Sequence, residues 1–467
     1  VGILTPKEML EGFSNKGMIT VALLFLVSEG IRQSGTLGQV IKKLLPQGKT
    51  TVFKAQLRIL PSVAFISAFL NNTPVVVIFA PIIKHWAKSV KLPATKFLIP
   101  LSYVTILGGI CTLIGTSTNL VVHGMILEAG YEGFTMFELG KVGIFIAIAG
   151  IIYLFIFSKR LLPDARPDTA VPDEEVEEGE KLHRVEAVLG ARFPGINKKL
   201  SDFNFQRHYG AEVKEIKTRN GQRYVDHLED VVLREGDTLV VMADDTFIPT
   251  WGESSVFVLL TNGNDPDTSG KKKRWLALIL LVLMIVGATV GELPATKEMF
   301  PDIKLDMFFF VCITTIIMAW TNIFPARKYT KYISWDILIT IACAFAISKA
   351  MVNSGVADCV AGFIIGLSDD YGPHVLLAIL FVITNLFTEL ITNNAAAALA
   401  FPLALSISAQ LGVSPTPFFV VICMAASASF STPIGYQTNL IVQGIGNYKF
   451  TDFVRIGLPL NIITFLI

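Results

Sequence analysis

Apolar stretches long enough to cross a bilayer as helices, about 20 residues each, recur along most of this chain. Their approximate positions are 17–33, 97–127, 138–158, 275–292, 305–321, 334–351, 357–367, 373–408, 415–446 and 453 onward. The composition agrees, since 52% of the 467 residues are hydrophobic and only 16% are charged. A soluble protein of this length is less apolar. The sequence therefore predicts a polytopic α-helical membrane protein.

The composition also excludes several functional classes. The net charge of +1 leaves no basic surface for nucleic acid. The five cysteines lie in apolar stretches without CxxC spacing, and the His, Asp and Ser residues lack the spacing of a metal site or a catalytic triad. We therefore expect no enzyme activity. Since the chain begins at Val1 without a Met and stops within an apolar run at Ile467, we expect further helices beyond both ends.

Two apolar stretches are interrupted by polar triplets. The stretch 59–84 contains Asn71-Asn72-Thr73, and the stretch 382–406 contains Thr392-Asn393-Asn394. Each triplet leaves about ten residues on either side, and ten helical residues rise only ~15 Å, half the hydrocarbon thickness. Irregular backbone at membrane depth is tolerated only where it is buried in protein or lines a cavity. We therefore predict two re-entrant helical hairpins whose tips line a cavity.

The two halves of the chain match each other in three places. Residues 14–35 match 334–355 at a shift of 320, the hairpin segments 69–81 and 390–402 match at a shift of 321, and IGTSTNLVVHG (114–124) matches IGYQTNLIVQG (434–444) at a shift of 320. Collinear matches at nearly one shift indicate an internal repeat, and repeated halves are typical of secondary transporters. The predicted fold class is therefore two inverted repeats, each with a re-entrant hairpin and an unwound helix.

A segment of different composition separates the halves. We divide the chain into a first membrane repeat (1–162), an acidic linker (163–183), a small inserted domain (184–262), a basic linker (263–274) and a second membrane repeat (275–467). Short β-type runs at 185–189, 212–216, 238–242 and 256–260 predict an α/β or mostly β domain. The basic cluster 271–274, directly before an apolar span, favours the cytoplasmic side. We therefore expect a multi-pass protein of the inner (plasma) membrane whose inserted domain is cytoplasmic.

The polar breaks suit the chemistry of ions. In the first hairpin we expect Thr73 to cap the returning helix, with Pro74 at its first position. The free N–H groups and partial positive charge of such an N-terminus favour an anion. The unwound backbone at 114–115 and 434–435 presents carbonyls, which suit Na⁺ together with the amide oxygens of the central asparagines. Because no Arg or Lys lies in the breaks, co-bound cations would help to hold the anion, and substrate affinity would depend on Na⁺.

These motifs resemble the divalent anion/sodium symporter family, whose two re-entrant hairpins carry a Ser-Asn-Thr signature. Both triplets keep the central Asn, while the flanking positions depart once in the first triplet and twice in the second. The resemblance implies two sodium sites, with ligands Ser67, Asn71, Asn72 and Gly115 in the first, and Thr388, Asn393 and Ser431 (within 428–432) in the second. The substrate contacts that it implies are Asn72, Thr73, Thr118, Asn393, Asn394, Tyr436, Gln437 and Thr438.

One departure bears on the substrate. The motif PIGYQTN places Tyr436-Gln437 where dicarboxylate carriers of the family have Thr-Pro, and in this it resembles the sulfate-type branch. That branch also carries a cytoplasmic insertion similar to the C-terminal regulatory (TrkA-C) domain of potassium-uptake regulators. The resemblance implies a sodium-coupled symporter of a small divalent oxyanion, with sulfate favoured over a dicarboxylate such as succinate. It also implies a homodimer with elevator-type motion. Two interpretations of the inserted domain stay open, a small-molecule regulator bound at 184–260 or a passive clamp of the dimer.

Several alternatives stay open at this point. Proton coupling or anion exchange is compatible with the same motifs, because Asn-rich breaks do not identify the cation. A ligand-gated ion channel is a further alternative, since similar regulatory modules sit on potassium channels, but a channel needs a continuous pore. Glu389, in the second hairpin, has two interpretations. It is either a functional acid at membrane depth or a side chain that bonds backbone at the hairpin tip.

Overall fold

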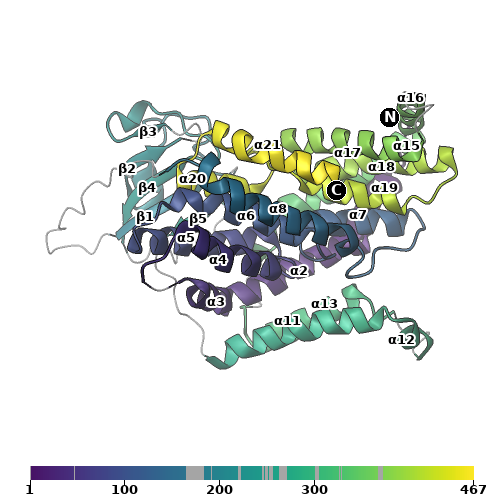
Figure 1. Ribbon diagram of the computed structural model, residues 1–467, viewed down its shortest axis with the longest axis horizontal. Coiled ribbons are helices and arrows are strands. Elements are labelled where there is room, and N and C mark those ends of the chain that lie inside the picture. The colour runs from purple at the N-terminus through teal and green to yellow at the C-terminus, as the bar shows by residue number, and fades with distance from the viewer. Residues whose placement is uncertain are drawn as a thin grey trace.

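The computed structural model of the protein is a helical body with one β-sheet at its end (Figure 1). It describes residues 2–46, 48–164, 183–190, 192–218, 222–244, 247, 251, 256–261, 271–299, 304–325, 327, 329–366 and 372–467. Most of the predicted acidic linker (165–182) and most of the basic linker (263–270) lie outside these ranges. Both linkers therefore stay predictions.

The helices of the first half begin and end where local sequence favours it. They are α1 (Pro6–Glu11), α2 (Lys16–Gln33), α3 (Thr36–Leu44), α4 (Val52–Ser67), α5 (Asn72–Ser89), α6 (Leu98–Gly109), α7 (Ser117–Glu128) and α8 (Gly140–Leu161). Asn15 caps α2 by accepting the backbone N–H of Gly17 at 2.7 Å. Helix α6 is apolar on every side, and all of its residues are buried. It therefore forms the centre of this half.

The second half is also helical. Its described elements are α11 (Lys271–Gly291), α12 (Pro294–Met299), α13 (Met307–Trp320), α14 (Tyr329–Tyr332), α15 (Trp335–Asn353), α16 (Val356–Gly366), α17 (Pro373–Leu390), α18 (Asn393–Leu411), α19 (Thr416–Ser427), α20 (Gln437–Gly446) and α21 (Phe450–Leu466). Helices α15 and α16 meet at an angle of 71°. Gly355 lies at this bend with φ +74°, a left-handed conformation that glycine adopts without strain.

Between the halves lies an antiparallel sheet, here called the sheet module (183–261). Its strands β1 (His183–Leu189), β2 (Glu212–Lys217), β3 (Arg223–Tyr224), β4 (Thr238–Ala243) and β5 (Phe257–Thr261) are ordered β3-β2-β4-β1-β5. One face packs on the short helix α9 (Phe205–Tyr209) and a cluster of aromatic side chains. The four predicted β-type runs coincide with β1, β2, β4 and β5, except that Val256 precedes β5 by one residue.

The apolar stretches predicted from the sequence form helices. Among the described residues, five helices are long and apolar enough to cross a membrane, or six if the bent pair α15–α16 is one span. The stretches 97–127 and 415–446 are each broken into two helices, at 110–116 and 428–436. The arms beside the polar triplets are longer than expected, because α4 has 16 residues and α5 has 18. The estimate of ten residues per arm was wrong, since it ended each arm at the nearest polar residue.

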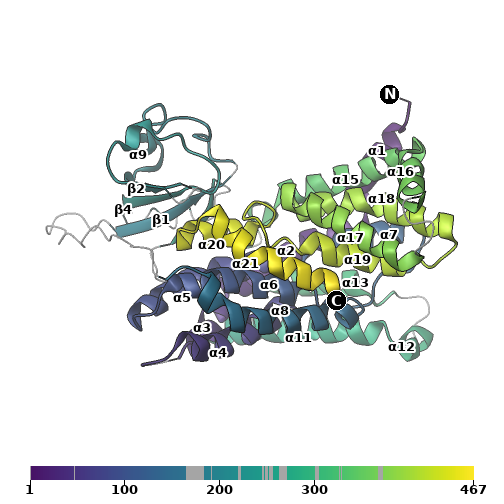
Figure 2. The same cartoon turned by 45° about the horizontal axis from the view of Figure 1, so that its top comes forward.

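Helices of the two halves interlock. Helix α20 packs against α5 and α6, α7 packs against α18 and α19, and α21 packs against α8. Figures 1 and 2 show the sheet module at the end of the body where α5 and α20 lie, while α11 runs along one side. The polar breaks therefore lie inside the body, where segments from both halves meet.

Candidate functional site

Four helices begin within the polar segments that the sequence singles out. Helix α5 begins at Asn72 and α18 at Asn393, at the tips of the helix pairs α4–α5 and α17–α18. Helix α7 begins at Ser117 and α20 at Gln437, directly after the two breaks. Each N-terminus presents free backbone N–H groups and a partial positive charge of about half a unit. Side-chain contacts bring the four N-termini together.

The hydroxyl of Tyr436 lies where these N-termini meet. Tyr436 directly precedes α20 and is 7% exposed. Its hydroxyl is 2.5 Å from the amide of Asn72 and 3.0 Å from the hydroxyl of Thr116, which directly precedes α7. Asn393, the first residue of α18, interacts with the same hydroxyl. One side chain thus links both central asparagines and both broken helices.

The amide of Asn72 is surrounded by oxygen atoms. Asn72 is 1% exposed. With its amide oxygen accepting from the Tyr436 hydroxyl at 2.5 Å, its nitrogen donates to the carbonyls of Thr105 at 3.0 Å and Gly115 at 3.2 Å and to the Ser67 hydroxyl at 2.8 Å. Both polar ends of the amide are then satisfied, as burial requires. The predicted ligands Ser67, Asn72 and Gly115 are thus brought together, and Thr105 joins them.

The tip of each helix pair bonds to the broken helix of the other half. The Thr73 hydroxyl donates to the side-chain oxygen of Gln437 at 3.2 Å. In the opposite direction, Ser117 and Thr118 donate to the amide oxygen of Asn394 at 3.3 Å and 3.2 Å. Thr73 and Asn394 are half-buried and Gln437 is exposed. The crossing contacts therefore join partly accessible side chains to the fully buried Thr118.

Two sets of hydrogen bonds recur in the two halves at the sequence shift of 320 or 321. The first set holds the helix before each tip. In the first half the Ser67 hydroxyl donates to the carbonyl of Thr105, and in the second half the Thr388 hydroxyl donates to the carbonyl of Ala426. The second set holds each break through an asparagine amide. Asn119 donates to the carbonyls of Gly109 and Thr112, and Asn439 donates to the carbonyls of Ser429 and Thr432. The matching sequences therefore make matching contacts.

Glu389 fixes the second break. Its carboxylate accepts the backbone N–H of Ser431 at 2.8 Å and the side-chain amide of Asn461 at 2.8 Å. Asn461, from α21, also donates to the Ser431 hydroxyl at 2.9 Å. The structure contains a contact of Glu389 with backbone, but this contact lies in the second break and not at the tip of α17–α18. The same contact places a carboxylate beside Thr388 and Ser431, two of the predicted sodium ligands.

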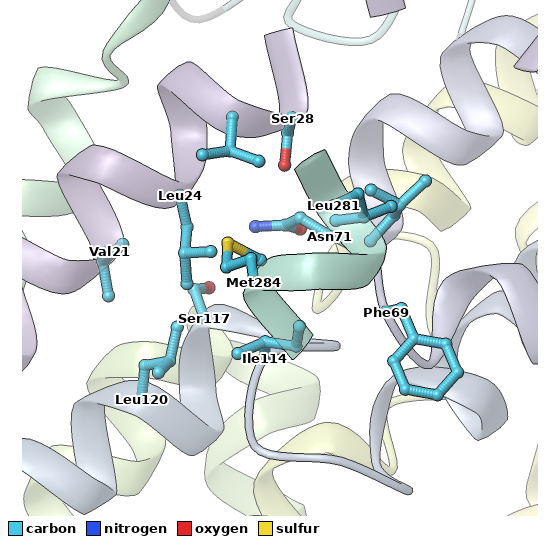
Figure 3. A pocket seen from close by; sticks show the side chains of 12 residues that line it. Val21, Leu24, Ser28, Phe69, Asn71, Ile114, Ser117, Leu120, Leu281 and Met284 are labelled. Atoms are coloured by element: carbon cyan, nitrogen blue, oxygen red, sulfur yellow. The ribbon is translucent and has the colours of Figure 1, made fainter. Parts of the chain in front are cut away.

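The side chain of Asn71 lies apart from the oxygen-rich surroundings of Asn72. It lines a small cavity formed mainly by apolar residues of α2, α7 and α11. Figure 3 shows it between Ser28 of α2 and Met284 of α11. The predicted cap of α5 is also different. Helix α5 begins at Asn72 with Asn71 at the N-cap position, and Thr73 bonds Gln437. The prediction that Thr73 caps α5 with Pro74 first was therefore wrong.

Sequence reasoning missed Ser102. This fully buried residue of α6 donates to the hydroxyl of Thr438 at 2.8 Å and to the side-chain oxygen of Asn439 at 2.7 Å. Ser102 therefore ties the start of α20 to the central helix. No local motif marks it, because a lone serine in an apolar helix resembles any small packing residue. The asparagines Asn119 and Asn439 carried a usable signal, since both belong to the repeated TNL motif.

The site is polar without carrying basic groups. The contacts around Tyr436 and Asn72 come from hydroxyls, amides and backbone carbonyls. Within the described ranges, no group of three or more His, Cys, Asp or Glu side chains is arranged to hold a metal ion. Oxygen ligands of this neutral kind suit an alkali cation better than a transition metal. The arrangement can therefore hold an anion at helix N-termini beside a cation among oxygens.

Comparison with known proteins points to one family. The profile described as citrate transporter matches residues 1–407 and, in an overlapping second match, 302–467. An uncharacterized transporter of Synechocystis is 30% identical over 99% of this chain and 89% of its own length. The Escherichia coli transporter YfbS is 26% identical over 99% of this chain and 91% of its own length.

A further similarity is shorter. Sodium/sulfate cotransporter 2 of Chlamydomonas reinhardtii is 30% identical over 60% of this chain, which corresponds to 31% of that protein. The family profile covers more than half of the chain, and the helical body has the apolar helices that a membrane transporter requires. The chain therefore belongs to the citrate transporter family, a group of membrane transporters related to the divalent anion/sodium symporters.

Proposed function

We propose that the protein is a sodium-coupled symporter of a small divalent oxyanion, with sulfate as the favoured substrate. The observation that carries this proposal is the meeting of four helix N-termini around Tyr436 and Asn72, without a basic side chain among the contacts. Partial positive charges and N–H donors favour an anion. A dianion held without Arg or Lys needs further positive charge, and bound cations supply it.

The first sodium site is proposed at Asn72. The Asn72 amide lies within hydrogen-bonding distance of the Ser67 hydroxyl and of the carbonyls of Thr105 and Gly115, and the Ser67 hydroxyl also donates to the Thr105 carbonyl. A cation in this place would be held by the two carbonyls, the Ser67 hydroxyl and the Asn72 oxygen. We keep Asn71 as a further candidate through its backbone only, because its side chain lines the separate cavity.

The second sodium site is proposed at the matching place of the other half. Thr388 donates to the carbonyl of Ala426 at 2.6 Å, and Asn393 lies at the tip of α17–α18. Ser431 lies in the break beside the carboxylate of Glu389. The carboxylate is a feature of the second half alone, since the position 321 residues earlier is Ala68. A nearby negative charge favours a bound cation.

The Asn72 amide offers a physical route to coupling. In the orientation that satisfies all partners, its nitrogen faces the oxygens and its oxygen faces Tyr436. A cation among those oxygens needs the amide oxygen, so the amide has to turn. The nitrogen then donates to the Tyr436 oxygen, so the Tyr436 O–H no longer donates to Asn72 and becomes a donor toward the anion site. Cation binding thus adds a hydrogen-bond donor for the anion, which makes anion affinity depend on the cation.

A dicarboxylate is the second candidate substrate. Some relatives are named sodium/sulfate cotransporters, whereas the matching family profile is described as citrate transporter. Sulfate is favoured because Tyr436 and Gln437 lie where the second break ends and α20 begins, and the Tyr436 side chain is buried there. A symporter or exchanger of a succinate-like anion uses the same four N-termini with more space between them.

The remaining architecture is part of the same proposal. We propose two inverted repeats (1–162 and 275–467) with re-entrant hairpins, and a cytoplasmic domain (184–262) of the TrkA-C type between them. The recurring hydrogen bonds of Asn119 and Asn439 support the repeat. The protein would lie in the plasma (inner) membrane as a homodimer, move its substrate by an elevator-type displacement, and bind a small-molecule regulator in the inserted domain.

Uptake into proteoliposomes tests the proposal. Radiolabelled sulfate and succinate are offered with an inward Na⁺ gradient, with the same gradient of K⁺, and with a pH gradient alone. We expect saturable sulfate uptake only with Na⁺, and weaker inhibition by unlabelled succinate than by unlabelled sulfate. Equal uptake with K⁺ would refute sodium coupling. Stronger inhibition by succinate would replace sulfate with the dicarboxylate.

A further inference from the structure

The sheet module has a second buried face. In β1, Val185, Ala187 and Leu189 point into the module's own core, so the alternating residues Glu186 and Val188 point to the opposite side. Val188 is fully buried and belongs to the apolar cluster of the helical body. A sheet face on a solvated domain is normally polar and exposed. This face is instead covered by helices of the body.

Two helices provide that cover. Helix α20 contacts the module closely, since a Cβ added at Gly444 would lie 2.5 Å from the Thr238 hydroxyl, and one added at Gly236 would lie 2.6 Å from Leu440. Glycine at 444 and 236 therefore permits an approach that larger residues would block. Helix α5 provides the second contact through Lys84. Figure 2 shows β1 beside the end of α20.

The contact with α5 is an ion pair in which two lysines, one from α5 and one from the sheet module, bind the same carboxylate. Lys84 donates to the two carboxylate oxygens of Glu186 at 2.9 Å and 3.0 Å, and Lys217 of β2 donates to the same carboxylate at 3.3 Å. The side chains of Lys84 and Glu186 are 22% and 16% exposed. Burial alone would raise the pKa of Glu186, but the two lysines lower it to about 2. The carboxylate is therefore ionised at neutral pH.

The two contacted helices are the ones that carry the candidate site. Lys84 is twelve residues after Asn72 and Gly444 is seven after Gln437, so these contacts lie ~18 Å and ~10 Å from the N-termini along the helix axes. Helices α5 and α20 also pack against each other. The sheet module therefore contacts two helices at a distance from their N-termini, and these N-termini form the proposed anion site.

We propose that this sheet face, centred on Glu186, is a docking surface that couples the sheet module to the anion site through α5 and α20. The sheet module thus contacts helices of both halves, because α5 follows the tip in the first half and α20 follows the break in the second half. A change in the module that loosens Glu186 would let the two helices shift relative to each other, and their N-termini would shift with them. The anion site is named here on the basis of the proposed function, whereas the docking itself is independent of the substrate.

Hydrogen–deuterium exchange of the full chain in lipid nanodiscs tests this coupling. The variants are Glu186→Gln and Lys84→Met, and Glu212→Gln is the matched control, because the Glu212–Lys214 pair on β2 is 54% and 51% exposed. Loss of a charged, partly buried hydrogen bond should raise exchange rates about 10-fold or more. We expect this rise in peptides covering 72–80 and 437–443 in both variants, and no rise in the control.

The outcomes separate the possibilities. Peptides of β4 report whether the module still folds, and Lys84→Met leaves the module sequence intact. If exchange rises only in β1 while 72–80 and 437–443 stay protected in Lys84→Met, the contact is a local anchor and the proposed coupling is wrong. The variants should also change the sulfate concentration for half-maximal uptake at least threefold. Absence of sulfate uptake in the wild type would refute the proposed substrate and leave the exchange result standing.

Discussion

Tyr436 and Thr116 are 320 residues apart in sequence, yet their hydroxyl groups lie 3.0 Å apart. They are also the matching positions of the repeated motifs, directly before α20 and α7. Such a contact between matching positions is what the proposed inverted repeat would bring about near its two-fold axis. Because one partner is tyrosine and the other threonine, the contact is unequal. The Tyr436 ring occupies space on its side of the contact that the smaller Thr116 leaves open on the other side. We expect the ring to limit the size of the anion that the proposed site can hold.

Replacing either central asparagine should abolish sodium-driven uptake. Asn72→Ala removes the amide that faces Ser67, Thr105 and Gly115, and Asn393→Ala removes its counterpart. We expect uptake to fall at least 100-fold, since a buried polar network then loses its shared member and leaves partners unpaired, at about 1–3 kcal/mol each. Asn353→Ala, at an exposed helix end, is the control. Uptake near the wild-type rate in both site variants would remove these residues from the site.

Substrate preference should follow Tyr436 and Gln437. Tyr436→Phe keeps the ring and removes the hydroxyl that joins Asn72 to Thr116, and Gln437→Ala removes the partner of Thr73. We expect Gln437→Ala to change the ratio of sulfate to succinate inhibition more than the Na⁺ concentration for half-maximal uptake, and Tyr436→Leu, which also removes the bulk of the ring, to change this ratio more than Tyr436→Phe does. Competition assays on purified protein measure both quantities. An unchanged ratio with an altered Na⁺ requirement would assign these side chains to cation binding.

Ser102 should matter for stability and for the start of α20. Ser102→Ala leaves the side-chain oxygen of Asn439 without its buried donor, so we expect a loss of about 1–3 kcal/mol in unfolding free energy. Ser62→Ala provides the control, because Ser62 is half-buried and its hydroxyl donates to the carbonyl of Arg58 within the same helix. Thermal unfolding in detergent measures the difference. Equal melting temperatures for the two variants would show that Asn439 finds another partner.

Acid should weaken the docking of the sheet module. The pKa of Glu186 is lowered from 4.5 to about 2, so its ionised form stabilises the folded state at pH values above about 4.5. This contribution is lost as the pH falls from about 4.5 towards 2. Glu186→Gln should therefore be less stable than the wild type at neutral pH, and the difference should shrink over that window. If the difference in stability between Glu186→Gln and the wild type stayed constant with pH, the substitution would act through packing and not through loss of the charge.

Deleting residues 184–260, with a short Gly/Ser bridge, should leave Na⁺-coupled uptake measurable. Each half keeps its tip and its break, so the proposed site needs no side chain from the module. The rate should change, because Lys84 and the end of α20 lose their partners. Uptake and calorimetric substrate binding measure the effect. Complete loss of binding in a properly inserted protein would make the module part of the transport machinery.

The sequence singled out the polar segments of the candidate site through its matching motifs. The triplets at 71–73 and 392–394 and the motifs at 114–124 and 434–444 mark the four helix N-termini, because polar breaks in apolar stretches are costly and rarely occur without a reason. The strands of the sheet module were also predictable, since alternation and turn residues are local signals.

Other parts of the site have no local signal. The link from Thr73 to Gln437 crosses between halves, and its existence depends on how α5 packs against α20. The roles of Ser102 and of Lys84 likewise come from tertiary packing, because each is a single polar residue on a helix. The start of α5 was misplaced by two residues, since Thr73 is a good cap by type while its hydroxyl is engaged elsewhere.

The crossing contacts have a consequence for synthesis. Tyr436 leaves the ribosome 320 residues after Thr116, a delay of roughly 20–60 s at 5–20 residues per second. During this time the Asn72 amide has no Tyr436, and the free N–H groups at the start of α5 and α7 have no second half beside them. Unpaired polar groups are costly in hydrocarbon. The nascent first half therefore has to keep its polar tip in water or against the insertion machinery until translation of α20 is complete.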